Sequence, residues 1–432
     1  MNYILAILSA SPLLGVAVRQ KDGFNRLFSV FAFTFALAFY CIPLAFAAEN
    51  NRLTYLGLGT PFYPDDRDSA LLAMFLFSLG FLGCDFLVKS SKSLNEIDLR
   101  KRNRSKILSN IISVIIMLIT AYLIYYLIST GYYEFTRTVR MKEAQASYLF
   151  TTFLLAMYYI NCLMFIISLS KKAYFTSTIW FTLSFLLILN FGGRMQVGIV
   201  LLIPLVHIVR HHGLLIALGV VGGVVFLPLV LKGKEIIAAI AIGGDVFTII
   251  TNAYIDGFDV ENVLNNFSHP LISYYYAPVL VDNIGYRYFW DIPQGFLFYL
   301  RLIGLDFGDS LTYYNTETIF FKRESIIPPG YLAFGYAQAN LFGVAVMGAV
   351  FRLFGRAAQI VKQQIGEDAP AADFLLAFLA ANTFYIGEMR GLVLTFIFPC
   401  VLMYIMVRLT KTDQDQASRK TRTSQSAAAS GY

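Results

Sequence analysis

Two arginines stand in glycine-rich junctions between apolar segments, where a guanidinium group could bind phosphate. Arg194 follows Gly192-Gly193 directly, and Arg390 lies within the sequence Gly-Glu-Met-Arg-Gly. Glycines permit a tight turn, and a guanidinium group donates two parallel hydrogen bonds to a phosphate. We therefore expect both arginines at the same outer membrane edge as phosphate ligands. Alternatively, Arg194 extends to the headgroups beside a simple turn, and Arg390 pairs with Glu388.

Further cations stand in segments that we expect at the same face. They are Arg137, Arg140, Lys322 and Arg323. Together with the two arginines they predict a cationic surface beside the lipid, which suits a diphosphate headgroup. Such donors also stabilise the negative charge that develops when a pyrophosphate departs. Alternatively, some of them are ordinary solvated charges.

Two side chains are candidates for a general base. Glu388 stands two residues before Arg390, and His269 lies in the polar segment 232–330. Histidine titrates near neutrality, and either side chain could remove a proton from a hydroxyl group. Alternatively, His269 is a structural residue of a loop. The sequence has no GxxxxGK[ST] phosphate loop and no metal-ligand spacing, so we expect no nucleotide or metal cofactor.

An apolar chain must position these side chains. Hydrophobic residues make up 57% of the 432 residues, charged residues make up 14%, and the mean hydropathy is +0.62. A soluble protein of this length cannot bury so much apolar side chain, so the composition predicts an integral membrane protein. The four cysteines lie far apart within apolar segments, which indicates buried thiols rather than disulfides or metal ligands.

Apolar segments of spanning length recur along the chain and predict an all-α polytopic protein with about 11 transmembrane helices. We expect an N-terminal bundle of about eight spans over residues 1–231 and a large outward-facing segment with short interfacial helices over 232–330. C-terminal transmembrane helices should follow over 331–409, and a disordered tail over 410–432. The predicted spans are 2–18, 27–48, 69–88, 107–130, 148–170, 173–191, 195–209, 214–231, 331–351, 371–387 and 391–407.

Lysine and arginine are divided unequally between the two sides that these spans define. Alternate loops, beginning with 19–26, contain most of the 34 Lys and Arg residues. Basic loops face the cytoplasm by the positive-inside rule. We therefore expect the N-terminus and the long polar segment outside and the C-terminal tail inside. The net charge of +7 is then a topology signal and gives no reason to expect nucleic-acid binding.

Two segments resemble the Wzy-type oligosaccharide repeat-unit (O-antigen) polymerases. One is Gly-Gly-Arg-Met around Arg194, after an apolar span. The other is the proline-led segment 327–343, which carries aromatic residues, an asparagine and Phe-Gly. The topology is similar too, with many spans and one large outer loop. An arginine followed by a glycine eleven residues later, a pattern of that family, is not found around Arg137, Arg194 or Arg323.

The resemblance implies an enzyme of the bacterial inner membrane with a periplasmic N-terminus and a cytoplasmic C-terminus. It implies transfer of a growing glycan from undecaprenyl diphosphate to an incoming lipid-linked repeat unit at the periplasmic face, without cofactors. The implied partners are the undecaprenyl-diphosphate-linked oligosaccharide, membrane lipids and a polysaccharide chain-length regulator. Candidate catalytic residues are then Arg194, Glu388 and His269, and candidate substrate ligands are Arg390, Arg323, Lys322, Arg137 and Arg140.

Two other functions stay open. One is an O-antigen ligase-like transfer of the glycan to lipid A core. The other is a flippase or secondary transporter of the same lipid-linked oligosaccharide. A transporter is expected to bury charged residues near the middle of the membrane. The expected position of the two arginines at the outer edge favours an enzyme.

Overall fold

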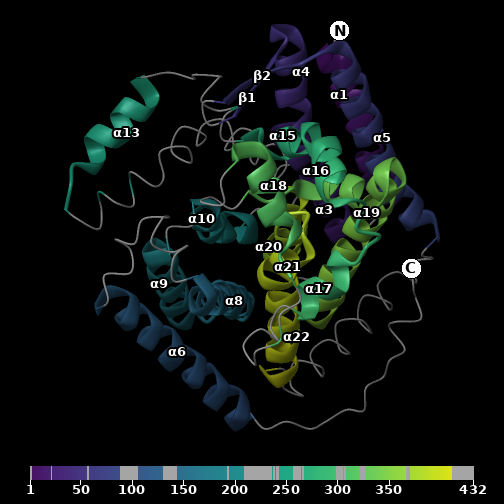
Figure 1. Ribbon diagram of the computed structural model, residues 1–432. Helices are drawn as coiled ribbons and strands as arrows, with labels where there is room; N and C mark the ends of the chain where they lie inside the picture. Colours follow the sequence, from purple (N-terminus) through teal and green to yellow (C-terminus); the bar gives the residue numbers. More distant parts are fainter. Residues whose placement is uncertain are drawn as a thin grey trace.

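The computed structural model is mostly helical (Figure 1). It describes residues 2–20, 22–55, 58–87, 106–129, 144–191, 194–208, 243–255, 267–297, 308–321, 327–365 and 370–410, with the single residues 236, 239, 264 and 305. The predicted tail lies outside the described residues beyond residue 410.

Long helices are interspersed with shorter helices and a pair of strands along the described parts of the chain. The N-terminal half contains α1 (Asn2–Ala10), α2 (Pro12–Arg19), α3 (Gly23–Ala36), the π-helical η1 (Leu37–Cys41), α4 (Ile42–Asn50), β1 (Arg52–Tyr55), β2 (Leu58–Pro61), α5 (Pro64–Leu87), α6 (Lys106–Ser129), α8 (Ala144–Ser170), α9 (Tyr174–Phe191) and α10 (Arg194–Ile208). The rest contains α13 (Val246–Ile255), α15 (His269–Tyr275), α16 (Ala277–Ile284), α17 (Asp291–Leu297), α18 (Leu311–Phe320), α19 (Gly330–Ile365), α20 (Pro370–Ala381), η5 (Asn382–Tyr385), α21 (Met389–Leu392), η6 (Val393–Ile397) and α22 (Phe398–Thr410).

Among the described residues, six helices are long and apolar enough to cross a membrane, or seven if the bent pair α1–α2 is one span. This confirms the prediction of a helical membrane protein. Two predicted spans, 173–191 and 195–209, contain shorter apolar helices, and 371–387 begins as the 12-residue α20. The span 214–231 lies outside the described residues, so a total of 11 spans stays a prediction. The six are Gly23–Asn50, Pro64–Leu87, Asn110–Ser129, Phe153–Ser170, Gly330–Ile365 and Met389–Arg408.

The all-α prediction missed a small antiparallel hairpin. β1 and β2 pair with Arg52 opposite Pro61. Each strand has only four residues, and such short segments give little periodic signal in a sequence. The Ser268 hydroxyl donates a hydrogen bond to the Thr54 carbonyl oxygen at 2.9 Å, which attaches the hairpin to the long polar segment.

Helices α5 and α19 pack closely because each brings glycines against the backbone of the other. A Cβ atom on Gly80 would lie 1.9 Å from the Ala345 carbonyl oxygen, and one on Gly348 would lie 1.9 Å from that of Phe77. The Phe77 and Phe351 rings pack beside these contacts, with 5.7 Å between their centroids. The N-terminal and C-terminal transmembrane helices therefore share one core.

This packing predicts that Gly348→Ala lowers the thermal unfolding midpoint of the purified protein. The new methyl group meets a backbone carbonyl that cannot move aside, and overpacking typically costs about 1–3 kcal/mol. Gly83 of α5 is the matched control because nothing lies within 4 Å of its Cβ position. Gly83→Ala should be neutral or slightly stabilising, since alanine favours helix. Size-exclusion chromatography after heating measures the unfolding midpoints of both variants. An equal decrease in the two midpoints would contradict the contact between Gly348 and the Phe77 carbonyl.

One end of the bundle collects charged side chains from several helices. Arg19 of α2 and Arg352 of α19 both pair with Asp85 of α5. Lys362 of α19 pairs with Asp22, which precedes α3. The charge distribution predicts the loops containing these arginines and lysines on one side of the membrane, and the structure places them at one end of the bundle. Which membrane side this end faces stays a prediction.

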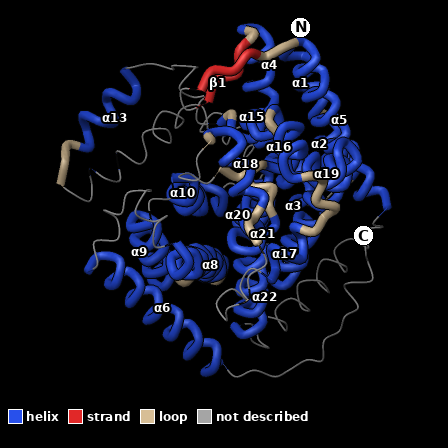
Figure 2. The backbone as a smooth tube through the Cα atoms, in the orientation of Figure 1, coloured by secondary structure: helices blue, strands red, loops and turns tan. Residues whose placement is uncertain are grey.

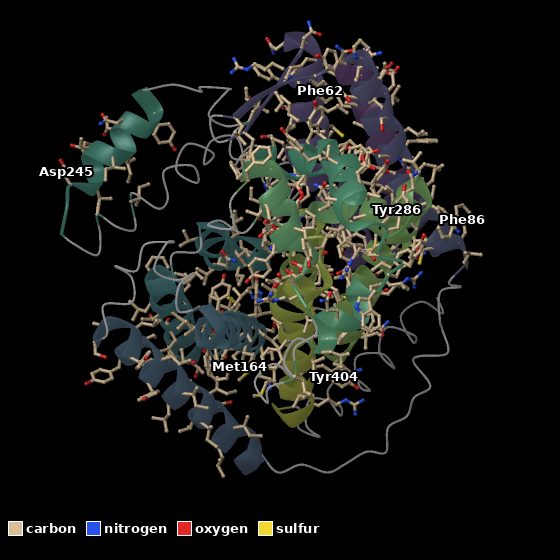
Figure 3. The ribbon with its side chains drawn as sticks, in the orientation of Figure 1. Phe62, Phe86, Met164, Asp245, Tyr286 and Tyr404 are labelled. Carbon is tan, nitrogen blue, oxygen red and sulfur yellow. The ribbon has the colours of Figure 1, made fainter. Side chains whose placement is uncertain are left out.

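The polar segment 232–330 contributes short helices that lie over the bundle. Helices α15 and α16 pack against α19, and α17 packs against α21, whereas α13 stands apart (Figures 1 and 2). Figure 3 shows Tyr286 near α16 and α19, and Asp245 directly before the separate α13. The short helix predicted over 292–305 is α17, and residues 298–304 lie outside the described residues.

Candidate functional site

Helix α19 is broken in its middle. Ala339 and Asn340 have non-helical dihedral angles, with φ 55° at Asn340. Gly335 and Gly343 stand eight residues apart, so in a straight helix their Cα atoms would be separated by about 12 Å. Instead, a Cβ atom on Gly343 would lie 2.0 Å from the Gly335 carbonyl oxygen. The chain therefore turns back, and the two pieces of α19 pack on each other at these glycines.

A distant part of the chain closes this break. The carbonyl oxygens of Ala337 and Gln338 end the first piece and accept hydrogen bonds from the backbone N–H groups of Arg287 and Tyr288, each at 3.0 Å. Tyr288 has φ 47°, a left-handed conformation that is uncommon for residues other than glycine. The predicted single span over 331–351 is therefore two helical pieces, and the polar segment stabilises the turn between them.

A second break, between α20 and α21, lies against the start of α19. Gly330 and Gly387 both have positive φ, at 69° and 65°. A Cβ atom on Gly387 would lie 2.2 Å from the Gly330 carbonyl oxygen, and the Gly330 N–H donates to the Ile386 carbonyl at 3.3 Å. The Tyr331 hydroxyl also contacts the Thr383 hydroxyl at 3.2 Å. We call Gly330, Tyr331 and residues 382–388 the glycine junction.

The glycine junction lies beside the middle of α5. The rings of Tyr331 and Phe384 lie 5.8 and 5.6 Å from that of Phe77, which stands near the centre of this 24-residue helix. The turn before Arg390 follows the 12-residue α20 and lies against α5 through the Phe384 ring. Its expected position at the outer membrane edge stays a prediction.

Glu388, the last residue of the glycine junction, and Arg390, two residues beyond it, are both buried, each 7% exposed. The Glu388 carboxylate accepts a hydrogen bond from the Thr312 hydroxyl at the start of α18. The guanidinium carbon of Arg390 lies 5.6 Å from the centre of the Tyr313 ring. Helix α18 therefore covers both charged side chains. The long polar segment and the transmembrane helices meet at one buried acid and one buried guanidinium group.

The surroundings of Glu388 favour its protonated form. Burial raises the pKa of its carboxyl group above the ordinary value of 4.5, and the nearby charge of Asp291 raises it further. The hydrogen bond from Thr312 and the charge of Arg390 oppose this rise without cancelling it. Glu388 therefore exchanges its proton at a higher pH than an exposed glutamate, which suits a general base or acid.

A second buried carboxylate, Asp291, ties α17 to the break in α19. It is 3% exposed. The Arg287 side chain donates two hydrogen bonds to it at 3.2 Å, and the Gln338 amide donates one at 2.7 Å. Helix α17 also packs on α21, since a Cβ atom on Gly295 would lie 2.7 Å from the Arg390 backbone nitrogen. The sequence analysis did not predict this cluster around Asp291. The only local indication of it in the sequence is the four-residue spacing of Arg287 and Asp291, which places both on one face of a helix.

Most of the predicted cationic ligands cannot be placed in the site. For Arg194 the structure describes the backbone, which begins α10. The Tyr158 hydroxyl of α8 donates a hydrogen bond to the Gln196 carbonyl oxygen at 2.5 Å. Helix α10 also packs against α20, which leads into the glycine junction. The predicted ligands outside the described residues are Arg137, Arg140, Lys322 and Arg323.

His269 begins α15 and lies among aromatic rings. Its ring centroid is 5.7 Å from that of Phe39, 6.3 Å from that of Tyr55 and 5.6 Å from that of Tyr385. Since Tyr385 belongs to the glycine junction, His269 borders the junction, whereas Glu388 lies within it. These contacts favour Glu388 over His269 as the proton-transferring residue.

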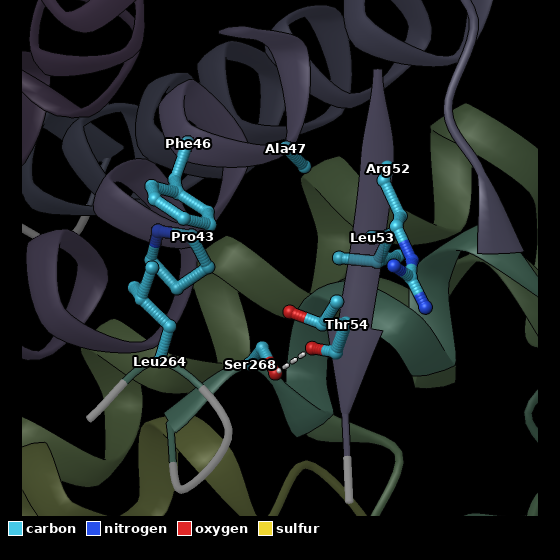
Figure 4. Close-up of a pocket in the computed structure, with 8 residues that line it drawn as sticks. All are labelled: Pro43, Phe46, Ala47, Arg52, Leu53, Thr54, Leu264 and Ser268. Atoms are coloured by element: carbon cyan, nitrogen blue, oxygen red, sulfur yellow. Dashed lines mark hydrogen bonds between the residues drawn. The ribbon is translucent and has the colours of Figure 1, made fainter. Parts of the chain in front are cut away.

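A small surface hollow is lined in part by Ser268, the residue before His269, and Glu388 is not among its lining residues. The Ser268 hydroxyl donates to the Thr54 carbonyl oxygen at its edge (Figure 4). The lining is mostly apolar and contains no carboxylate or histidine, so it lacks a group for proton transfer. Its lining residues are Pro43, Phe46, Ala47, Arg52, Leu53, Thr54, Leu264 and Ser268.

The glycine junction and Arg390, two residues beyond it, bring a buried carboxylate and a buried guanidinium group close together. The described part of the chain brings no three His, Cys, Asp or Glu side chains into a metal-binding arrangement. Comparisons with protein-family models, with curated proteins and with solved structures find no match for the chain. Glu388, Arg390 and the elements that cover them are therefore the candidate functional site.

Proposed function

We propose that the protein polymerises lipid-linked oligosaccharide repeat units. In this proposal it transfers a growing glycan from undecaprenyl diphosphate to an incoming lipid-linked unit at the periplasmic face of a bacterial inner membrane. The observation that carries the proposal is the burial of Glu388 beside Arg390, under α18 of the long polar segment. The resemblance around Arg194 and over 327–343 supports the same reaction.

The two charged side chains supply what this transfer requires. An acceptor hydroxyl group attacks the anomeric carbon of the donor sugar, and Glu388 takes the hydroxyl proton. The bond from that carbon to the diphosphate oxygen breaks, and undecaprenyl diphosphate leaves with the bonding electrons. Arg390 stabilises the negative charge on the leaving group. Arg194 would add a second guanidinium group, since it begins α10, which packs against the α20 helix that leads into the glycine junction.

We propose that the four remaining predicted cations bind the substrate. Lys322 and Arg323 belong to the polar segment that contributes α18, and Arg137 and Arg140 belong to the loop after α6. We assign these four to the sugar-phosphate part of donor or acceptor. A ligase-like transfer to lipid A core would use the same chemistry with a different acceptor.

Transport of the same lipid-linked oligosaccharide is the second candidate, and the broken helices favour it. Secondary transporters bind substrate near the membrane midplane, between discontinuous helices. Both α19 and the α20–α21 pair are interrupted, and the glycine junction lies beside the middle of α5. An experiment must therefore separate bond formation from movement across a membrane.

We expect the purified protein to lengthen lipid-linked glycans in detergent, with EDTA present and without nucleotides. The diphosphate is already a good leaving group, so the reaction needs no further source of energy. Detergent removes the membrane, so a transporter has nothing to cross and makes no product. Mass spectrometry of the lipid-linked glycans measures the chain length over time.

A matched incubation with lipid A core as the acceptor distinguishes the ligase-like reaction. Elongation of the lipid-linked glycan supports the polymerase, and transfer to the core supports the ligase. Unchanged glycans in both incubations, from protein that elutes as a single folded species, would overturn the enzyme. Movement of the labelled lipid across a vesicle membrane would then identify the transporter.

A further inference from the structure

The charged end of the bundle contains a carboxylate surrounded by arginines. The side chain of Asp85 is fully buried. It accepts hydrogen bonds from Arg352 at 2.7 and 3.1 Å, from Arg356 at 3.1 Å and from Arg19 at 3.4 Å. Gln20 donates a further bond at 3.2 Å. Three guanidinium groups from two separate helices therefore share one negative charge.

This arginine cluster, Arg19, Arg352 and Arg356, has more positive charge than Asp85 can balance. The side chain of Arg352 is fully buried. Its Nε and Nη2 atoms bond to Asp85, whereas its Nη1 atom has no hydrogen-bond partner among the described residues. An uncompensated buried charge with an unused donor is costly. Within the described parts of the chain, the cluster therefore lacks an anion that balances its charge.

The neighbouring carboxylates are already engaged elsewhere. Asn25 accepts a bond from Arg352 at 2.8 Å and donates one to Asp22 at 3.0 Å, so it separates these two charges. Asp22 pairs with Lys362 at 3.7 Å, and Lys362 also pairs with Asp373 at 3.4 Å. Both carboxylates therefore pair with Lys362 and not with the arginine cluster.

Other neighbours increase the positive charge or leave the cluster accessible. The exposed side chain of Arg26 donates to the Gln20 carbonyl oxygen at 3.2 Å, which adds a cation beside the cluster. The side chains of Arg19 and Arg356 are 39% and 17% exposed. Phe86, under the Arg19 guanidinium group, is 59% exposed. The cluster therefore opens to the surface beside exposed apolar side chains.

We propose that Arg19, Arg352 and Arg356 form a binding site for a phosphate group, at the end of the bundle away from the hairpin. Planar guanidinium groups match the oxygens of a phosphate through paired hydrogen bonds. The phosphate supplies the missing negative charge and accepts a bond from the unused donor of Arg352. The exposed apolar side chains beside the opening suit the acyl chains of a lipid, so a lipid headgroup or free phosphate can carry the group. This site is independent of the glycine junction.

The test uses the purified full-length protein in neutral detergent at constant ionic strength. Its unfolding midpoint is measured while inorganic phosphate, phosphatidylglycerol or a galactosyl diacylglycerol without phosphate is added. We expect saturable stabilisation by at least one phosphate compound and none by the galactolipid. Arg19→Gln and Arg356→Gln should each weaken the apparent affinity about tenfold, the loss typical of one charged hydrogen bond. Arg408→Gln, in the last turn of α22, is the control and should keep the affinity.

Each outcome supports or overturns the phosphate site, or identifies the compound that carries the phosphate. Stabilisation by phosphatidylglycerol alone identifies a lipid headgroup, and stabilisation by inorganic phosphate identifies the free anion. If Arg356→Gln fails to fold, the partly exposed Arg19→Gln still reports the affinity. The proposal is overturned by an absent or unsaturable response, by equal stabilisation with the galactolipid, or by equal losses in Arg19→Gln and Arg408→Gln.

Discussion

Glu388→Gln should lower the rate of glycan elongation by about 10²–10⁴-fold, the usual contribution of proton transfer to or from a side chain. Glutamine keeps the shape and can still contact Thr312, but its amide cannot take the proton of the acceptor hydroxyl. Because Glu388 is buried and covered by α18, solvent has little access to replace it. Initial rates in the detergent assay, with lipid-linked repeat units as substrate, measure the loss.

Glu317→Gln is the matched control for this variant. Glu317 lies on α18, the same helix that covers Glu388, and its side chain is only partly buried. The control should keep the wild-type rate. Thr312→Val, which removes the hydrogen bond while keeping the size, should cause a smaller loss than Glu388→Gln. A rate near that of the wild type for Glu388→Gln would assign the proton transfer to another residue and return His269 to consideration.

The pH dependence of the stability of Glu388→Gln gives a second measurement. The folded protein keeps the Glu388 proton to a higher pH than the unfolded chain, whose carboxyl group has a pKa near 4.5. The folded state then binds more protons in that interval, so this residue's contribution to stability is complete below the unfolded pKa and is lost as pH rises through the folded pKa. Glu388→Gln should therefore lose less stability than the wild type as pH rises. For activity the sign is opposite, because the base works only after losing its proton.

The sequence alone predicts the features of the fold that depend on local composition. Long apolar runs predict the spans within Gly23–Asn50 and Pro64–Leu87, since a bilayer imposes length and hydropathy directly. The positive-inside rule groups Arg19 with Arg352, and both pair with Asp85 at one end of the bundle. In each case the signal lies in neighbouring residues or in their type.

The breaks in the helices escape prediction because their causes are distant in sequence. Gly335 and Gly343 are equally compatible with a straight helix, and the apolar run over 331–351 predicts one. The turn at Asn340 is held by backbone N–H groups of Arg287 and Tyr288, about 50 residues earlier, and no propensity scale contains that contact. The same limitation hides Asp291, whose partner Gln338 lies in another segment.

The position of the glycine junction bears on how the two functions compare. An enzyme was favoured by the expectation that Glu388 and Arg390 lie at the outer membrane edge, and this depth stays a prediction. The structure places Tyr331 and Phe384 of the junction against Phe77 of α5 and α18 over the charged pair, an arrangement that either function could use. In the proposed reaction, a carboxylate with a raised pKa beside a guanidinium group suits proton transfer together with stabilisation of the leaving group.

Arg390→Ala should abolish the polymer in cells, with a rate loss of about 10²–10³-fold, as expected when one donor to a developing negative charge is removed. The protein should remain inserted, and single repeat units should accumulate on their lipid acceptor. Arg390→Lys should recover part of the activity, since an ammonium group keeps the charge but lacks the planar pair of donors. Gel separation of surface glycans, with membrane-extracted protein quantified in parallel, measures both variants.

The lysine variant also distinguishes a loss of activity caused by misfolding from one caused by the missing charge. Arg390 is buried against Tyr313 and its backbone contacts α17, so alanine removes packing as well as charge. If packing were the only role of Arg390, methionine would fill the space and work better than lysine; if charge stabilisation is its role, lysine works better than methionine. Arg408→Ala, in the last turn of α22, controls for the loss of one cation and should leave the polymer unchanged. Polymer of normal length and amount from Arg390→Ala would remove this residue from the proposed reaction and leave Arg194 as the remaining candidate for the leaving group.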